Sequence, residues 1–489
     1  MDRKVVLLET AKLPTSYIPY IALSYCWGGK DPAKTLRSNY QNRARGMSIA
    51  MLPRTYRQAV YLARQLGINH VWIDALCIVQ DDNEDWQRES SRMAEIYSGA
   101  YIVFVAAAAA DVEGGLDISA DLKDWRHLTE HQVRAGSMWV RFKDHKSDVC
   151  AFLPISTRAW TYQERRLAKR CLIFGESEVV WECRRGCRCP CFGAQTVVRQ
   201  PTPQLLPSVP GTTGRHFASS QDAYRFWSPA FHVFSKMQLT RPTDRLPAIS
   251  AIATVIQAVT GDKYLAGLWR SGLLLQLAWR PDGNWSRQDS PYGVYVAPSW
   301  SWASFPGAAL LMHAGQVEFQ AENAEILHVS CEPANLCSPL GAVHHGTLTL
   351  RGFCVWVNVQ HLGGNSPAHF DKLSMISNEF EFHVALRLDY SLKTGDRFQD
   401  LLPERLSEAH VMPRARVEKR GVPEMPVQLL YLTRNIFLVL SSSTRKHGAY
   451  FRTGILSLSE DLVNRDEANK TNVRKQLLSA ANREEVVVV

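Results

Sequence analysis

Residues 70–110 constrain the fold of this chain more than any other stretch, because three periodicities follow one another in them without a break. A β-branched run at residues 71–73 predicts a strand, the spacing of residues 81–99 predicts a helix, and the apolar run at residues 101–105 predicts a second strand. Two strands joined by a crossover helix are expected to lie parallel, and parallel strands are usually buried on both faces. The stretch therefore predicts one unit of an α/β sheet.

Asp74 follows the first of these strands, at its carboxyl end. Ligands bind at the carboxyl ends of the strands in open α/β sheets, so Asp74 is a candidate site residue. An aspartate at this place can equally cap the turn or helix that follows. We expect Gly99 to end the predicted helix as its C′ residue. The apolar face of that helix would carry Trp86, Met93, Ile96 and Tyr97.

A second strand-and-helix pattern precedes this unit. Residues 20–26 (YIALSYC) predict a strand that is followed by Trp27, Gly28 and Gly29. A glycine pair allows either a plain tight turn or a close approach of the backbone to a ligand. Residues 52–66 then have the spacing of an amphipathic helix. The two patterns together predict two successive βα units and a third strand.

Residues 111–155 interrupt the pattern, and we predict that they are a surface insertion. Helical spacing returns at residues 159–168, where Trp160, Glu164 and Leu167 share one face. A carboxylate on the same face as two large apolar residues is unusual, so Glu164 is a candidate for chemistry. The alternative is an ion pair with the neighbouring arginines, Arg158, Arg165 and Arg166.

A cysteine-dense segment follows a predicted hairpin of residues 170–174 and 178–183. Its four cysteines are Cys183, Cys187, Cys189 and Cys191. Cysteine is a zinc ligand, but the spacing Cys-x3-Cys-x-Cys-x-Cys is not one of the usual finger spacings. Alternate residues of an extended chain also lie roughly 6.6 Å apart, so their thiols do not readily coordinate one tetrahedral ion. We therefore favour free thiols, with a metal site at these cysteines as the alternative.

The composition is typical of a globular chain inside the cell. Of the 489 residues, 46% are hydrophobic and 21% are charged. The chain has no run of about 18 apolar residues and no signal-peptide pattern, so we expect no membrane span and a cytoplasmic location. Eleven scattered cysteines fit reduced thiols better than a disulfide framework. The net charge of +9 is modest for this length, so it does not predict nucleic-acid binding.

The order of the patterns divides the chain into four parts. These are an α/β domain at residues 1–192, a Pro/Ser/Thr-rich linker or loop at residues 193–221, a helical extension at residues 222–305 and a β-rich region at residues 306–489. In the extension we expect helices at residues 222–239, 243–259 and 264–279, the first of them broken at Pro229. The β-rich region predicts an antiparallel β unit with exposed loops such as residues 403–426. From about residue 466 we expect a charged helix or a frayed tail.

Several blocks occur in the order typical of one fungal family. They are YIALSYCWGG from Tyr20, LPRTYRQAVYLARQLGINHVWIDALCIVQDDNEDWQRESSRMAEIYSGA from Leu52, and STRAWTYQERRLAKRCLIF from Ser156 with WEC at Trp181. On these blocks the chain resembles the fungal heterokaryon-incompatibility (HET) domain proteins. The further blocks RPTDRLPAIS, YLAGLWRSGLLLQLAW and APSWSWAS are similar to the extension of large family members, so the resemblance covers about residues 1–305.

The resemblance implies an intracellular fungal protein with a role in non-self recognition and regulated cell death. HET domains are in turn similar to Toll-type (TIR) domains, which implies a TIR-like parallel sheet flanked by helices. Trp160 and Glu164 resemble the Trp-x-x-x-Glu of TIR enzymes, whose glutamate acts on the ribose of NAD while the nicotinamide bond is cleaved. A carboxylate near the ribose can stabilise the oxocarbenium-like transition state of such a reaction.

Two hypotheses follow. In the first, the protein is an NAD-binding or NAD-cleaving death effector with Glu164 as the acting carboxylate and a pocket lined by Trp27, Gly28, Gly29, Asp74 and Trp160. In the second, the protein is a non-enzymatic signalling module that assembles with itself or binds a protein partner. A cysteine nucleophile at Cys77 with His70 is not favoured, because their side chains are expected to point in opposite directions.

Overall fold

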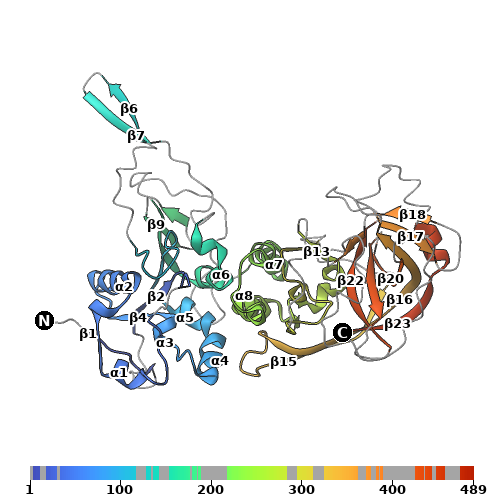
Figure 1. The fold of residues 1–489 in the computed structure, drawn as a ribbon, viewed down its shortest axis with the longest axis horizontal. Coiled ribbons are helices and arrows are strands. Elements are labelled where there is room, and N and C mark those ends of the chain that lie inside the picture. Colours follow the sequence, from blue (N-terminus) through green and yellow to red (C-terminus); the bar gives the residue numbers. More distant parts are fainter. Residues whose placement is uncertain are drawn as a thin grey trace. The chain divides into compact units, whose positions relative to one another are not determined.

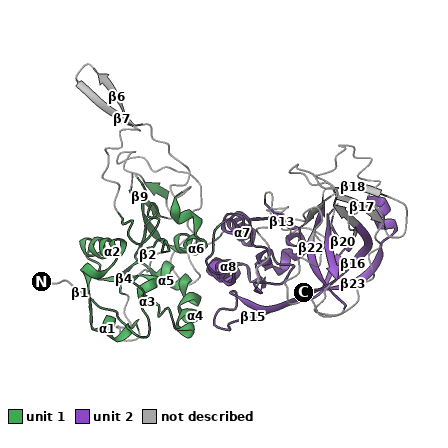
Figure 2. Ribbon diagram, in the orientation of Figure 1, with its two compact units in different colours: residues 1–217, 237–239 green, residues 218–236, 240–489 purple. Residues whose placement is uncertain are grey.

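The structure is a computed structural model of the chain, drawn in Figure 1. It describes residues 4–10, 18–29, 33–116, 128–133, 136–141, 153–176, 179–183, 186–188, 217, 219–282, 294–311, 324–361, 371–375, 381–384, 386–388, 424–433, 436–442, 448–457 and 474–489. The chain divides into two compact units (Figure 2). Unit 1 contains residues 1–217 and 237–239, and unit 2 contains residues 218–236 and 240–489.

Unit 1 is built on a mixed sheet that has six strands among the described residues. In spatial order they are β10 (Gly186–Arg188), β9 (Val179–Cys183), β8 (Arg170–Phe174), β5 (Ile102–Val105), β2 (Tyr20–Ser24) and β4 (His70–Trp72). Neighbouring strands from β4 to β8 run parallel, whereas β9 pairs antiparallel with both β8 and β10. The α/β architecture and the hairpin after the last helix are confirmed, but the sheet is not parallel throughout.

Helices and two small two-stranded sheets complete the described part of unit 1. The helices are α1 (Tyr40–Arg45), α2 (Arg54–Gln65), α3 (Asp74–Cys77), α4 (Asn83–Ser91), α5 (Met93–Gly99) and α6 (Ala159–Leu167). The strands β1 (Lys4–Val5) and β3 (Met47–Ser48) pair antiparallel, as do β6 (Leu128–Val133) and β7 (Gly136–Arg141). The core joins Ile21, Leu23 and Phe104 of the sheet to Tyr56 and Ala59 of α2. β5 is buried along its whole length, as expected for a strand covered on both faces.

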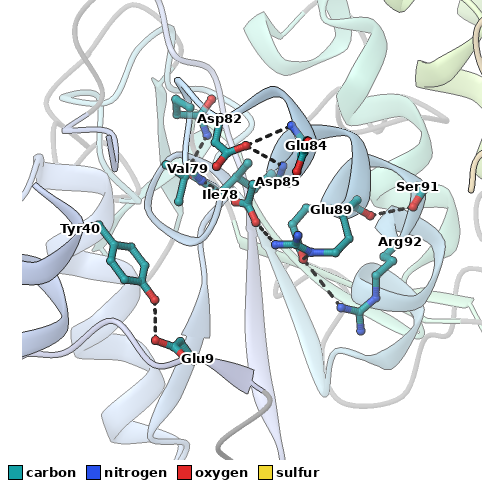
Figure 3. A network of polar contacts seen from close by, with 12 residues as sticks. Glu9, Tyr40, Ile78, Val79, Asp82, Glu84, Asp85, Glu89, Ser91 and Arg92 are labelled. Carbon is teal, nitrogen blue, oxygen red and sulfur yellow. Dashed lines mark hydrogen bonds and ion pairs between the residues drawn. The ribbon is translucent and has the colours of Figure 1, made fainter. Parts of the chain in front are cut away.

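The helix predicted at residues 81–99 is two helices. Asp82 caps α4 by accepting hydrogen bonds from two backbone N–H groups of its first turn (Figure 3), and Arg92 leaves the helical conformation between α4 and α5. The prediction for Gly99 is wrong, because this residue is the last one of α5 and does not have the positive φ of a C′ glycine. A Cβ at Gly99 would lie 2.8 Å from the Tyr20 hydroxyl, so close packing is what requires glycine here.

Unit 2 begins with two helices that pack on each other, α7 (Ser220–Ser235) and α8 (Pro247–Thr260). A 3-10 turn, Pro242–Asp244, precedes α8, and eight of the fourteen residues of α8 are buried, among them Ile249, Ile252 and Ile256. The predicted break at Pro229 is wrong, because α7 continues through it. A proline removes one intrahelical hydrogen bond, but the burial of Trp227 and Phe231 on either side keeps the helix intact.

The helix predicted at residues 264–279 is also wrong. This segment forms the hairpin of β11 (Tyr264–Leu265) and β12 (Leu268–Trp269), the short helix α9 (Leu273–Gln276), and β13 (Trp279–Pro281), which pairs with β14 (Ala309–Leu311). Ala266 and Gly267 have positive φ, which turns the chain and interrupts the helical pattern. A Cβ at Gly267 would lie 2.4 Å from Nε1 of Trp302, so glycine is needed at the turn.

The rest of unit 2 is one sheet that has nine strands among the described residues. They are β15 (Ala324–Pro333), β16 (Val343–His361), β17 (Asp371–Met375), β18 (Glu381–Val384), β19 (Leu386–Leu388), β20 (Glu424–Thr433), β21 (Ile436–Ser442), β22 (Ala449–Ser457) and β23 (Asn482–Val488). All pairs are antiparallel except β22 with β23. The predicted antiparallel β unit is confirmed.

The chain end differs from the prediction. Residues 474–479 are helical, as predicted for one of the two alternatives, but the chain then forms the strand β23, which pairs with β16. Val486 and Val488 are buried, and this burial of alternate residues holds the strand in the sheet. The predicted linker up to residue 216 and the predicted loop up to residue 423 lie outside the described residues.

Candidate functional site

Asp74 is the residue where β4 passes into α3, and both of its carboxylate oxygens accept hydrogen bonds. Oδ1 accepts from the hydroxyl of Tyr25 at 2.6 Å and from the backbone N–H of Ala75 at 2.7 Å, and Oδ2 accepts from Nε1 of Trp27 at 3.1 Å. Asp74 is the first residue of α3 and not its cap residue, although its bond to Ala75 is local; the other two bonds hold the loop that follows β2, and the ligand-binding role of Asp74 remains a prediction. Asp74 fixes the position of the Trp27 ring.

A second tyrosine extends this network into the core. The hydroxyls of Tyr25 and Tyr56 are 2.6 Å apart, and the two rings meet edge to face at a centroid distance of 5.2 Å. Burial, and next the charge of Asp74, raise the pKa of both tyrosines above the ordinary value. Both phenols therefore stay protonated, and Tyr25 remains a donor to the carboxylate.

Glu164 lies on α6 and is buried, with 5% of its surface exposed. Burial, and next the negative charge of Asp74, raise the pKa of the Glu164 carboxyl from 4.5 to about 7. The hydroxyls of Ser24 and Tyr97 and the charge of Arg158 act in the opposite direction, because they favour the carboxylate. The structure thus brings Glu164 and Asp74 into one electrostatic environment, which we call the acidic centre.

Arg158 is the cation of this centre. It stands just before α6 and donates a hydrogen bond to the backbone carbonyl of Tyr25. Burial raises the pKa of the Cys26 thiol, and Arg158 partly opposes that rise. Among the three arginines expected near Glu164, Arg165 forms an ion pair with Glu182 (Nε to Oε2, 2.8 Å) and Arg166 lies over the ring of Tyr162. Arg158 is the arginine whose charge favours the Glu164 carboxylate.

Both glycines after β2 have a backbone conformation that favours glycine, and one of them also lies in a closely packed place. Gly28 and Gly29 both have a positive φ, +70° and +72°. A Cβ at Gly28 would lie 2.1 Å from Cβ of Asp111, whereas a Cβ at Gly29 would have no neighbour within 4 Å. The backbone at Gly28 therefore approaches the segment after β5 closely, and the side of Gly29 is open. Their roles as pocket residues remain predictions.

Trp160, predicted to line the pocket, is half-buried on α6 and meets Trp86 of α4. The ring centroids are 6.3 Å apart, with planes at 89°. Trp160 and Glu164 are four residues apart in the helix and therefore share a face. Trp86 was expected to belong to the apolar face of its helix, but it is only half-buried.

The cysteines give no metal site among the described residues. In the hairpin of β9 and β10, Cys187 lies opposite Glu182 and Cys183 lies opposite Gly186. These adjacent register positions direct the two thiols to opposite faces, so Cys183 and Cys187 do not converge on one ion. Cys189 and Cys191 lie outside the described residues. Burial raises the pKa of Cys77 to about 12, which opposes a thiolate nucleophile there.

Sequence reasoning missed Tyr25 and Tyr97 at the acidic centre and did not single out Arg158 as the arginine that acts on Glu164. Tyr97 was assigned to an apolar face, although its hydroxyl donates a hydrogen bond to the backbone carbonyl of Leu23 and lowers the pKa of Glu164. Arg158 was considered as one of three equivalent arginines. The places of two of these residues in the sequence could have indicated their role. Tyr25 directly follows a predicted parallel strand and Arg158 directly precedes a predicted helix, and side chains from such ends converge at one edge of the sheet.

Comparison with known proteins gives a family similarity for unit 1. Residues 20–164 match the family model described as Heterokaryon incompatibility protein (HET). A segment is 29% identical over 151 residues to heterokaryon incompatibility protein 6, OR allele, of Neurospora crassa, and it covers 27% of this chain and 22% of that protein. The match thus spans about a fifth of the relative's length. Both similarities support the HET family for this part of the chain.

No solved structure matches the chain, and the TIR-like fold remains a prediction. Within the described residues, the structure contains no helix with the length and apolar character needed to cross a membrane.

Proposed function

We propose that this protein acts in non-self recognition of the heterokaryon-incompatibility type and promotes regulated cell death. Unit 1 is the effector part, and its acidic centre binds and cleaves NAD or a closely related dinucleotide. The observation that carries the proposal is the buried carboxyl of Glu164 on α6, a helix that packs on the parallel strand β2; burial and the charge of Asp74 raise the pKa of this carboxyl to about 7. Support comes from the family similarity of residues 20–164 and from the Trp-x-x-x-Glu spacing of Trp160 and Glu164.

The chemistry needs one carboxylate. The bond between C1′ of the ribose and the nicotinamide nitrogen breaks, and its electron pair leaves with nicotinamide, whose ring becomes neutral. Water adds to C1′ and gives up a proton, which leaves ADP-ribose. Glu164 in its charged form stabilises the positive charge that develops on the ribose. Because its pKa is about 7, a large fraction is charged near neutral pH.

One observation favours a second function, a signalling module that acts by assembly with itself or with a protein partner. Only 5% of the surface of Glu164 is exposed, so a substrate cannot reach it without a rearrangement of neighbouring side chains. A group buried in this way can stabilise the fold without catalysis. In this alternative, the acidic centre holds the ends of β2, β4 and α6 together, and surfaces of unit 1 carry the signal.

Purified full-length protein incubated with NAD distinguishes the two functions. The wild-type protein is expected to release nicotinamide, and Glu164→Gln is expected to release it at least 100-fold more slowly, since the loss of one group that stabilises transition-state charge costs about 10² to 10³ in rate. Glu176→Gln is the matched control, because Glu176 is an exposed glutamate. No nicotinamide release by a folded wild-type protein at pH 6, 7 and 8 would remove the enzymatic function and leave assembly.

A further inference from the structure

Five strands of unit 2 form a closed circuit of pairings. β16 pairs with β20, β20 with β21, β21 with β22, β22 with β23, and β23 pairs again with β16. Figure 1 shows four of these strands, β16, β20, β22 and β23, side by side. A sheet that closes on itself is a barrel, and the mouth of a barrel is a common place for a ligand site. The circuit therefore gives unit 2 an interior face whose open end can hold a ligand.

The strand register shows which side chains share one face of this barrel. Trp356 of β16 lies opposite Gln428 of β20, and Gly352, four residues earlier in β16, lies opposite Glu484 of β23. Alternate residues of a strand point to the same side, so Trp356, Gln428 and Glu484 share a face.

The face that carries Trp356 is the interior of the barrel. Its further residues are apolar and at most 1% exposed: Leu348, Leu350, Leu430, Leu438, Val486 and Val488. On the opposite face of β16 and β23, Phe353, Arg483 and Glu485 are exposed. A barrel buries the side chains of its inner face, so this contrast in burial distinguishes the two faces.

At one end the barrel interior is polar and open to solvent. Trp356 is 37% exposed, and Tyr450 of β22 and Glu484 are half-buried. The rings of Trp356 and Tyr450 lie 6.3 Å apart between centroids, with planes at 49°. Gln428 is wholly buried, and its Nε2 donates a 2.8 Å hydrogen bond to Oε2 of Glu484. These four residues form the barrel-end cluster.

The barrel-end cluster carries a negative charge that the described part of the chain does not neutralise. No described lysine or arginine pairs with Glu484, whereas its neighbour Glu485 pairs with Arg351 (Oε1 to Nη2, 2.6 Å). Burial, and next the charge of Glu484, raise the pKa of the Tyr450 hydroxyl, and the same two causes raise the pKa of the Cys354 thiol to about 12. Both groups therefore stay neutral and leave Glu484 as the charge of the cluster.

A second acceptor of the cluster is unpaired. Oε1 of Gln428 is buried and has no hydrogen-bond partner among the described residues. A buried acceptor without a partner destabilises the folded state, because its hydration is lost and not replaced. A ligand that brings a donor to this oxygen restores the missing hydrogen bond.

We propose that the barrel-end cluster binds an organic cation with an ammonium or guanidinium group. Glu484 is the counter-charge, the rings of Trp356 and Tyr450 contact the cation through their π faces, and Oε1 of Gln428 accepts one of its N–H groups. The source of the group is a free amine or guanidine, or a lysine or arginine side chain of a peptide. This binding site belongs to unit 2, and it does not depend on the proposed cleavage of NAD in unit 1.

The chemistry of the cluster selects against other ligands. An anion is repelled by Glu484, and a neutral apolar molecule leaves the carboxylate and the amide oxygen of Gln428 without a donor. An organic cation satisfies both groups, since the carboxylate and the ring faces attract its charge and its N–H groups are donors. A guanidinium adds a planar surface that stacks on an aromatic ring.

Calorimetric titration of the full-length protein tests the role of charge. The probes are butylammonium and methylguanidinium, with butanol and butyrate as the neutral and anionic counterparts of the first. Glu484→Gln is expected to weaken binding of both cations at least tenfold, because the counter-charge is lost while the shape of the side chain is kept. Glu485→Gln is the matched control and should leave both affinities unchanged, because Glu485 is the next residue of β23 and points to the exterior.

A second pair of variants tests the aromatic contribution. Trp356→Ala is expected to weaken binding about two- to fivefold, the range for one cation–π contact at an exposed site. Phe353→Ala is its control, because Phe353 is a similarly exposed aromatic residue of β16 on the exterior. Higher salt should weaken binding by the wild-type protein, which tests the charge without any substitution.

Peptide probes identify the source of the cation. Tighter binding of the acetylated and amidated tripeptides Gly-Arg-Gly or Gly-Lys-Gly than of the free cations assigns the site to a peptide, and equal or weaker binding assigns it to a free amine or guanidine. No saturable binding of any cationic probe by the folded wild type would overturn the inference. Undiminished binding by folded Glu484→Gln, or binding of butanol as tight as that of butylammonium, would overturn it equally.

Discussion

The hydroxyl of Tyr25 donates a 2.6 Å hydrogen bond to Oδ1 of Asp74, while the backbone carbonyl of Tyr25 accepts one from Arg158. One residue thus links the loop after β2 to the start of α3 and to the start of α6. Asp74 and Arg158, at the starts of these two helices, lie 49 and 133 residues from Tyr25 along the chain. The acidic centre is therefore assembled by the tertiary fold. A substitution at one of its residues should change the hydrogen bonds or the pKa values of the others.

Asp74→Asn should lower the free energy of unfolding by about 2 kcal/mol, because a charged acceptor serves three donors at this position. The new amide NH2 also faces one of the N–H donors, so at least one of the three hydrogen bonds is lost. Urea unfolding followed by tryptophan fluorescence measures the change. Asp81→Asn, at an exposed residue that accepts one backbone hydrogen bond, should change the free energy by less than about 1 kcal/mol.

The stability of the protein should fall as pH rises from 4.5 to about 7, because the pKa of Glu164 is raised in the folded state. The folded protein then binds more protons than the unfolded chain in this window, so the slope of the unfolding free energy with pH is negative. A pKa of about 7 corresponds to about 3 kcal/mol lost above that pH. Glu164→Gln should be more stable than wild type at pH 8 and close to it at pH 4.5. Parallel pH profiles for the two proteins would contradict the raised pKa.

Two charges next to Glu164 should shift its pKa in opposite directions. Asp74→Asn removes a negative charge that raises the pKa, and Arg158→Gln removes a positive charge that lowers it. The carboxyl of Glu164 should therefore titrate at a lower pH in the first variant and at a higher pH in the second. Difference infrared spectra of the carboxyl band against Glu164→Gln report the midpoint. Shifts of the same sign in both variants would mean that the three groups do not form one cluster.

The two glycines after β2 should differ in their tolerance of a side chain. Gly28→Ala places a Cβ 2.1 Å from Asp111 with φ at +70°, so it should cost about 3 kcal/mol or more. The Cβ of Gly29→Ala has no neighbour within 4 Å, so only the φ of +72° lowers the free energy of unfolding, by about 1 kcal/mol. Thermal unfolding of the two variants gives the comparison. Equal losses would show that the approach to Asp111 does not determine the turn.

The α/β core could be predicted from sequence because its signals are local. Parallel strands such as β5 are apolar runs, and α2 and α6 have clear helical spacing. The errors arose where tertiary packing overrides the local pattern. Pro229 remains inside α7 because the helix is buried on both sides of it, and the chain at Ala266 and Gly267 turns where a helix was expected.

The candidate site was predicted less completely than the fold. Glu164 and Asp74 could be selected because carboxylates at a strand end or on an apolar face are conspicuous in the sequence. Tyr25, Tyr97 and Arg158 could not, since a tyrosine on an apolar face is ordinary core and an arginine has many possible partners. Their roles depend on hydrogen bonds between segments far apart in the chain, which no local spacing encodes.

The most direct test of the central claim follows NAD and viability together in cells after induced expression of the full-length chain. Wild type and the control Glu176→Gln are expected to deplete NAD before viability falls, and Glu164→Gln, expressed at the same level, is expected to do neither. Cell death at the wild-type rate with unchanged NAD, or NAD loss that persists in Glu164→Gln, would contradict the assignment of Glu164 as the acting carboxylate.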